Sequence, residues 1–216
     1  MVNECMLHTE MSEQAATRGE RKERTRQALL DGTLALAADR GFAALSLREI
    51  ARSANIVPTA FYRHFASLED LGATLVDDGV TALRLALREV RRNSDAGLSD
   101  TIRFVFAQVD PKRELFGFLT RERHGGSLAL RTAISLELQL IVRELVADLS
   151  RIRALDEWRP RDLEVAADLL VATVTDSIAA YVSAAPRDQR MIVDRTLQQV
   201  RLISLGIRAW KPRNES

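Results

Sequence analysis

The chain has 216 residues, 46% of them hydrophobic, with only 10 Gly and 5 Pro, which favours long helices over a turn-rich β fold. Its formal net charge of +1 argues against a uniformly basic surface, so any charge that binds nucleic acid must be local. The single cysteine, Cys5, cannot form an internal disulfide, and no long uninterrupted apolar run appears, so we expect a cytoplasmic protein without a membrane span.

The first part of the chain predicts a tail followed by a helix. Residues 1–17 are polar and lack periodicity, which predicts a flexible tail. In Arg18–Arg26 five basic residues accompany two acidic ones, and they form either a solvated helix start or contacts to DNA phosphates. The apolar pattern then continues as one helix to about Arg40, where Gly41 ends it.

A short second helix begins after Ser46. Ser46 precedes an apolar run and Glu49 follows three residues later, so the two side chains can cap each other's backbone amides. The helix is therefore expected to start at Leu47. Asn55 follows it, and asparagine tolerates the left-handed conformation that often ends a helix.

A third helix follows across this turn. Pro58 fits the first turn of a helix, where an amide partner is not needed, and residues 59–64 continue it. Phe61 and Phe65 lie four residues apart and would anchor the helix to a core. Two short helices joined in this way predict a helix-turn-helix unit, whose second helix commonly lies in the major groove of DNA.

The segment 54–65, AlaAsnIleValProThrAlaPheTyrArgHisPhe, followed by LeuGluAspLeu at 68–71, resembles the recognition motif of TetR-family transcriptional regulators. Asn55, Val57 and Thr59 depart from the pattern, since the family often has glycine, serine and glycine at these positions. The loss of a capping serine is expected to cost about 1 kcal/mol, which Pro58 partly offsets.

The resemblance implies an all-α, TetR-like protein with two parts. Residues 18–67 would form a three-helix DNA-binding head, and residues 68–216 a helical body for ligand binding and dimerisation. Phosphate contacts are expected from Ser46 and Tyr62. Base contacts are expected from Thr59, Ala60 and Arg48. The candidate DNA-binding residues are Arg26, Ser46, Arg48, Pro58, Thr59, Ala60, Tyr62, Arg63 and His64.

Two further stretches narrow the resemblance. Residues 46–49 together with 58–65, and again residues 119–125, are similar to the FabR and DesT repressors of unsaturated fatty acid synthesis. This likeness implies a long-chain acyl-CoA as the effector and no other cofactor. An alternative is a repressor of the same type that responds to another hydrophobic molecule, such as the substrate of an efflux pump.

The body is expected to be a set of long helices. Ser67 would cap a helix from Leu68 to about Arg92, roughly 37 Å long. Further helices are predicted over 101–109, 114–124, 128–152, 163–182 and 187–210. The last two would pair with their copies in a homodimer, the final one through the stripe Ile192, Leu197, Val200, Ile203 and Ile207. The alternative to a homodimer is a monomer in which these two helices are part of a thick hydrophobic core.

Candidate ligand-binding residues gather in the middle of the body. Aromatic side chains concentrate over 104–118, which suits an apolar tunnel but also an ordinary core. Arginines in the stretch that resembles FabR and DesT would hold the polar end of an acyl-CoA, or would only pair with Glu122 on the surface. The candidate ligand-binding residues are Phe104, Phe106, Phe116, Leu119, Arg121, Arg123, Thr175 and Asp176.

Other function classes have little support in the sequence. The three histidines are scattered and the cysteine lies in the tail, so no metal cluster has suitable spacing. Neither a phosphate-binding loop nor a nucleophile elbow is present. We therefore expect a regulator that binds palindromic double-stranded DNA rather than an enzyme, with an adaptor that does not bind DNA as the remaining alternative.

Overall fold

The computed structural model describes residues 17–92, 98–125 and 127–210, and regular structure within these ranges is helical throughout. This confirms the predicted all-α fold class. The elements in chain order, with η for a short 3-10 helix, are α1 Arg18–Arg40, η1 Phe42–Ala44, α2 Leu47–Ser53, α3 Pro58–Phe61, α4 Leu68–Arg92, α5 Leu98–Val109, η2 Asp110–Lys112, α6 Arg113–Glu122, α7 Leu128–Leu149, η3 Arg153–Leu155, α8 Pro160–Ser183 and α9 Pro186–Ala209.

Most helix bounds agree with the sequence prediction. α1 ends at Arg40 and α4 spans Leu68–Arg92, as expected, and Ser67 accepts a hydrogen bond from the Asp70 amide at 3.1 Å. α8 begins at Pro160, three residues before the predicted start, because a proline in the first turn needs no amide partner. Residues 1–16 of the predicted tail lie outside the described residues, whereas Thr17 caps the start of α1. The division at 67/68 stays a prediction.

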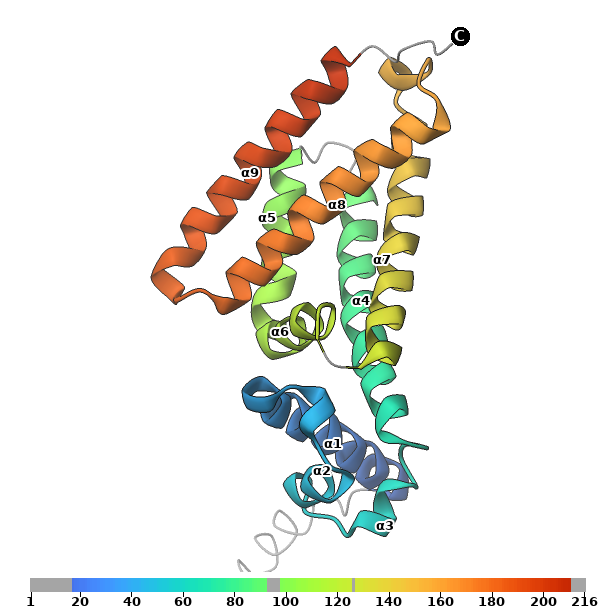
Figure 1. Ribbon diagram of the computed structural model, residues 1–216, viewed down its shortest axis with the longest axis vertical. Coiled ribbons are helices and arrows are strands. Elements are labelled where there is room, and N and C mark those ends of the chain that lie inside the picture. Colours follow the sequence, from blue (N-terminus) through green and yellow to red (C-terminus); the bar gives the residue numbers. More distant parts are fainter. Residues whose placement is uncertain (1–16, 93–97, 126, 211–216) are drawn as a thin grey trace, which may run out of the picture.

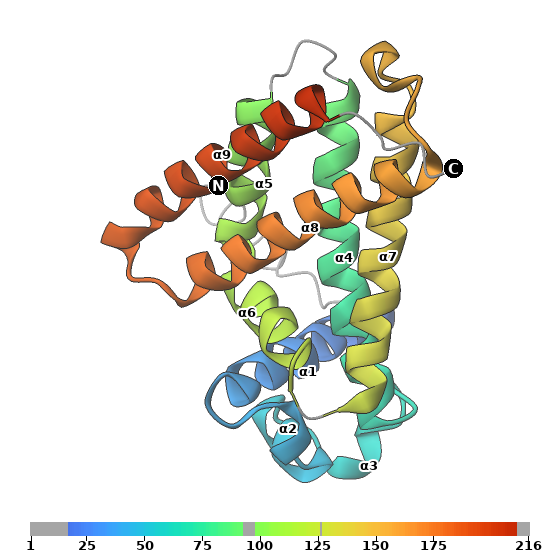
Figure 2. The same ribbon diagram turned by 45° about the horizontal axis from the view of Figure 1, so that its top comes forward.

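The helices form a small head and a taller body (Figure 1). α1, α2 and α3 make up the head, and α4 rises from it along the body. α8 packs against α6, α7 and α9, and α5 packs against α4 and α9. Both views place α6 across the junction, between the head and α8 (Figure 2). The body is thus a helix bundle. It is joined to the head by α4, and its helix α6 packs against α1.

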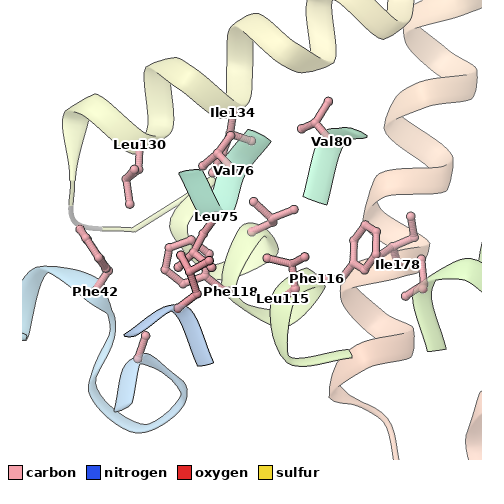
Figure 3. Close-up of a cluster of buried hydrophobic side chains, with 14 of the residues drawn as sticks. Phe42, Leu75, Val76, Val80, Leu115, Phe116, Phe118, Leu130, Ile134 and Ile178 are labelled. Carbon is pink, nitrogen blue, oxygen red and sulfur yellow. The ribbon is translucent and has the colours of Figure 1, made fainter. Parts of the chain in front are cut away.

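One hydrophobic core runs through both parts. Its buried side chains extend from Leu29 and Phe61 in the head to Phe106 and Val200 in the body. Figure 3 shows Phe42 of η1 among core residues of α4, α6 and α7. A continuous core of this kind means that the head cannot turn on the body without repacking side chains.

The contact at the junction is close. The rings of Phe42 and Phe118 pack edge to face, with their centroids 5.8 Å apart. Gly72 of α4 lies against Phe42 and Leu130, and a Cβ atom there would come within 2.9 Å of each. Glycine at this position therefore lets α4 approach η1 and α7.

The final helix has two different apolar faces. The predicted stripe on α9 packs inward: Val200 is buried, and Ile192, Leu197 and Ile207 pack against core clusters. This corrects the prediction that the stripe faces a second chain. A separate set of side chains on α8, on α9 and just after α9 is more than half exposed, namely Val165, Leu169, Met191, Leu202, Leu205 and Trp210.

α8 is also the one helix among the described residues that is long and apolar enough to cross a membrane by length and composition. The same composition arises in a helix that must be covered on several sides. In this structure α8 packs against four other helices, α5, α6, α7 and α9, and its outward face remains exposed.

Candidate DNA-binding surface and ligand cavity

The reciprocal cap predicted for α2 is present. The Ser46 hydroxyl accepts from the Glu49 amide at 3.3 Å, and the Glu49 carboxylate accepts from the Ser46 amide at 3.0 Å. Arg40 pairs with the same carboxylate at 3.0 Å. The hydroxyl of Ser46, its amide and the Arg40 guanidinium together lower the pKa of Glu49 from 4.5 to about 2. The cap therefore stays charged across the neutral range and fixes the start of α2.

This cap predicts a pH dependence. Because the pKa of Glu49 is lower in the folded chain, its contribution to stability is complete well above 4.5 and disappears as the pH falls toward about 2. We expect Glu49→Gln to lower the melting temperature at neutral pH, and the difference from the unmodified chain to shrink steadily in acid. Thermal melts at several pH values measure it, and a difference that does not change with pH would contradict this role.

The turn between α2 and α3 also follows the sequence signals. Asn55 has a φ of 55°, the left-handed conformation expected for it. Val57 provides no side-chain cap, and Pro58 occupies the first turn of α3. α3 is shorter than predicted, because it ends at Phe61 and the chain continues in turns to Phe65. The lost cap is consistent with so short a helix.

The candidate DNA-binding side chains share one end of the head. Phe61 and Phe65 are buried, as predicted, and they support a surface on which most of the candidates are exposed. The exposed ones are Ser46, Arg48, Pro58, Thr59, Tyr62 and Arg63, and the partly buried ones are Arg26, Ala60 and His64. Their contact with DNA stays a prediction.

Arg26 and His64, two of the partly buried candidates, interact with neighbouring side chains of the head. The Arg26 guanidinium lies over the Phe65 ring, 5.1 Å from its centroid, which ties α1 to the end of the recognition segment. Burial, followed by the charges of Lys22 and Arg26, lowers the pKa of His64. This shift favours the neutral imidazole of His64 in the free protein.

Two adjoining apolar cavities lie inside the body. The lower cavity, about 60 Å³, lies between α4, α6, α7 and α8, and the upper cavity, about 260 Å³, between α4, α5, α7 and α8. Leu83, Ile141 and Thr175 line both, so the cavities meet at these residues. We call the two together the channel.

The predicted ligand-binding residues divide into two groups. Phe116, Leu119, Arg123, Thr175 and Asp176 all line the lower cavity, which the structure thus assembles from α6 and α8.

The other three, Phe104, Phe106 and Arg121, line neither cavity, and their part in ligand binding stays a prediction. Phe106 is buried against Tyr181, with ring centroids 5.0 Å apart, and Phe104 lies partly exposed on α5. Arg121 points toward the head, where its guanidinium donates to the Ala37 carbonyl.

The lower cavity has one polar end. Arg123 donates to the Thr175 hydroxyl at 2.9 Å and lies 3.7 Å from the Asp176 carboxylate, and His124 lines the cavity beside it. The Arg123 side chain is 29% exposed and that of Asp176 is 76% exposed. The guanidinium is therefore held in place while it remains accessible from solvent, as a group that receives an anion must be.

Sequence reasoning missed two features of this region. The aliphatic walls of the upper cavity, from Leu83 and Leu87 to Val171 and Val174, look like ordinary core positions in the sequence. Glu122 was expected only as a surface partner of the arginines. It is instead buried, and it accepts a hydrogen bond from the Phe42 amide at 3.0 Å.

A family model matches part of the N-terminal region of the chain. Residues 29–73 match the family model described as bacterial regulatory proteins, tetR family. This stretch covers α2, α3, most of α1 and the start of α4. The family match therefore includes the segment 54–65, on which the resemblance to TetR-family regulators was based.

Solved structures resemble most of the chain. A protein described as a TetR-family transcriptional regulator from Syntrophomonas wolfei has a TM-score of 0.69 at 16% identity, over 87% of this chain and 97% of that one. FadR, a fatty acid degradation regulator from Bacillus halodurans, gives 0.65 at 17% identity, over 82% and 94%. FadR from Bacillus subtilis, solved in complex with stearoyl-CoA, gives 0.64 at 17% identity, over 82% and 96%. At these identities the likeness establishes a shared fold.

Proposed function

We propose that this chain is a TetR-type transcriptional regulator, acting as a repressor in the cytoplasm, that binds a palindromic operator as a homodimer. Its effector would be a long-chain acyl-CoA, and its target genes would serve fatty acid metabolism, in particular the unsaturated branch. The observation that carries the proposal is an apolar channel with one polar end, where Arg123 pairs with Asp176, in a body that adjoins a helix-turn-helix head.

The DNA half of the proposal follows from the head. One recognition helix reads too few base pairs to find a site in a genome, whereas two related by a twofold axis read a palindrome. Half-sites would lie about 34–36 Å apart, or slightly more, on one face of the duplex. The exposed apolar side chains of α8 and α9, such as Leu169 and Leu202, support a dimer through these helices.

The ligand half follows from the channel. An engineered apolar cavity of about 150 Å³ holds benzene, so the upper cavity has room for several methylene groups. Each buried methylene contributes about 0.8 kcal/mol, which makes chain length easy to sense. Arg123 would hold the thioester end or a CoA phosphate. The stearoyl-CoA bound to FadR of Bacillus subtilis is a parallel case in a protein of the same fold.

An operator shift assay across acyl-CoAs of different length and saturation tests the proposal. We expect at least one long-chain acyl-CoA to change operator affinity by about five- to 150-fold, whereas free CoA, which lacks the acyl chain, leaves it unchanged. Indifference to every acyl-CoA would remove the lipid effector and leave the DNA-binding proposal standing. A response to other apolar compounds alone would favour the second candidate, a regulator that senses efflux-pump substrates, which the apolar channel walls also suit.

The division of roles in the head is separately testable. We expect Arg48→Ala to relax sequence preference, because its guanidinium would read a guanine, at a cost of about 1–3 kcal/mol on operator DNA. Tyr62→Phe should weaken binding to all sequences alike, because its hydroxyl would contact phosphate. Titrations of both variants against operator and random duplexes measure this. The division is refuted if Arg48→Ala, like Tyr62→Phe, loses affinity in equal proportion on operator and random DNA.

A further inference from the structure

His64 lies at the end of the recognition segment in cationic surroundings. It belongs to the turns after α3 and is partly buried, and its Nδ1 atom is buried without a hydrogen-bond partner among the described residues. Lys22 and Arg26, four residues apart on one face of α1, act on it electrostatically, as does its neighbour Arg63. Glu23 acts in the opposite direction. Among these neighbours three cations therefore oppose one carboxylate.

One of these cations is held in place, and the acidic groups at the start of α4 serve that helix. The Arg26 guanidinium lies over the Phe65 ring, 5.1 Å from its centroid. Asp70 accepts from a backbone amide at 2.8 Å. Hydrogen bonds from its own amide and from the Ser67 hydroxyl lower the pKa of Glu69. Both carboxylates are thus engaged at the start of α4.

Two physical effects favour a neutral His64 in the free protein. Burial comes first, because a charged ring loses its hydration and a proton on Nδ1 would have no acceptor. Repulsion from Lys22, Arg26 and Arg63 adds to it, and together these effects lower the pKa of His64 below its ordinary 6.5. The ring is therefore mostly uncharged near neutral pH.

Contact with DNA would reverse the second effect and oppose the first. His64 follows Tyr62 and Arg63, which are exposed on the candidate DNA-binding surface. Phosphates would pair with the nearby cations, and a phosphate beside the ring would attract an imidazolium directly. An opposite charge within about 4–6 Å shifts a pKa by about one to three units in favour of the charged form. A rise of this size moves the titration of His64 toward the neutral range.

We propose that His64 gains a proton when the head meets DNA, so that each bound head takes up to about one proton and DNA binding strengthens as the pH falls. The sign follows from linkage. Because the bound state holds the proton more tightly, affinity is greatest at a pH below the titration of the free ring, and it declines until the bound ring is also neutral. This inference rests on the proposed DNA binding, but not on the acyl-CoA or on an operator sequence.

The test uses the full-length protein and a random-sequence duplex at low salt, because a phosphate contact does not depend on base sequence. Imidazole NMR titrations give the pKa of His64 with and without the duplex. Calorimetry in buffers of different ionisation heat counts the protons taken up on binding. His64→Gln identifies the His64 signal and keeps an N–H donor. His8→Gln, in the segment outside the described residues, removes a different histidine and is the matched control.

Two lysine variants test the cationic surroundings without DNA. Lys22→Met should raise the pKa of His64 in the free protein, because among the neighbouring charges Lys22 has the largest effect on it. Lys112→Met removes an exposed lysine of η2 instead and should leave the pKa of His64 unchanged. Equal His64 titrations in the two variants would overturn the proposal, since the cations of α1 would then not control the ring.

On the duplex we expect the pKa of His64 to rise by at least about one unit, which corresponds to about a tenfold gain in affinity per head across the titration. The unmodified chain and His8→Gln should take up protons on binding, and His64→Gln should take up less than about half as many. The affinity of His64→Gln should also change less between about pH 8 and about pH 6 than that of the unmodified chain.

The outcomes separate this inference from the proposed function. A duplex that binds without raising the pKa of His64, or with equal proton uptake in His64→Gln and the unmodified chain, overturns the proton linkage and leaves the DNA-binding proposal standing. If the unmodified protein binds no duplex even at low salt, the DNA-binding proposal fails, and the proton linkage fails with it.

Discussion

Replacing both Leu202 and Leu205 by arginine is expected to yield a monomer that binds its operator about 10²–10⁴-fold more weakly than the unmodified chain. The two leucines lie on the outward face of α9 and are 68% and 52% exposed. Paired charges there would have to be desolvated in a dimer interface without partners, which strongly disfavours association. The loss in DNA affinity follows because, in a dimer, binding of one head to its half-site raises the effective concentration of the second head at the other half-site. A monomer lacks this gain.

The fold of the variant should be unaffected, because neither leucine belongs to a core cluster. Analytical ultracentrifugation and operator titration measure the two effects, and a thermal melt checks the fold. Leu128→Arg is the matched control: it adds a charge at a leucine that is 70% exposed at the start of α7, far from α9 (Figure 1). A dimer that survives the double change, or an equal loss in the control, would mean that the chains meet elsewhere.

The head could be predicted in detail because its signals are local in sequence. The cap of Ser46 with Glu49, the left-handed Asn55 and the first-turn proline each depend on a few neighbouring residues, and all are present. The same reasoning placed the start of α4 at Leu68 and its end at about Arg92, in agreement with the structure. It overestimated α3, which ends at Phe61, after which the chain continues in turns.

The channel could be predicted only in part, because it depends on which helix faces which. Phe116, Leu119 and Arg123 are spaced by three and four residues and share one face of α6, and they line the cavity together. Arg121 lies about 200° around the helix from Arg123, so the two cannot serve the same site. That angle could have been read from the sequence.

Glu122 illustrates what local patterns leave out. A glutamate at the end of a helix is usually solvated, and nothing in its neighbours indicates burial. Its partner, the Phe42 amide, lies 80 residues earlier in the chain. Only the packing of α6 against α1 and η1 brings them together, and this packing is set by core residues such as Phe118.

A substitution where the two cavities adjoin can test whether an acyl chain runs through both of them. Leu83 lines both cavities, whereas Leu85, two residues later on α4, lines a polar cleft against α1 and is 56% exposed. A bulky side chain at Leu83 would therefore divide the channel, and the same change at Leu85 would leave it open. A long acyl chain must pass the junction, but a short one can remain in a single cavity.

We therefore expect Leu83→Trp to lower affinity for oleoyl-CoA about 200-fold, because excluding about four methylenes forfeits about 3.2 kcal/mol. Hexanoyl-CoA should lose little, and operator binding without acyl-CoA should stay within about twofold, since the head is unaltered. Calorimetric titration measures the acyl-CoA affinities, and a thermal melt accounts for overpacking, which costs about 1–3 kcal/mol. Leu85→Trp should match the unmodified chain throughout. Equal losses for long and short chains, or undiminished oleoyl-CoA binding, would mean that the acyl chain does not run between the cavities.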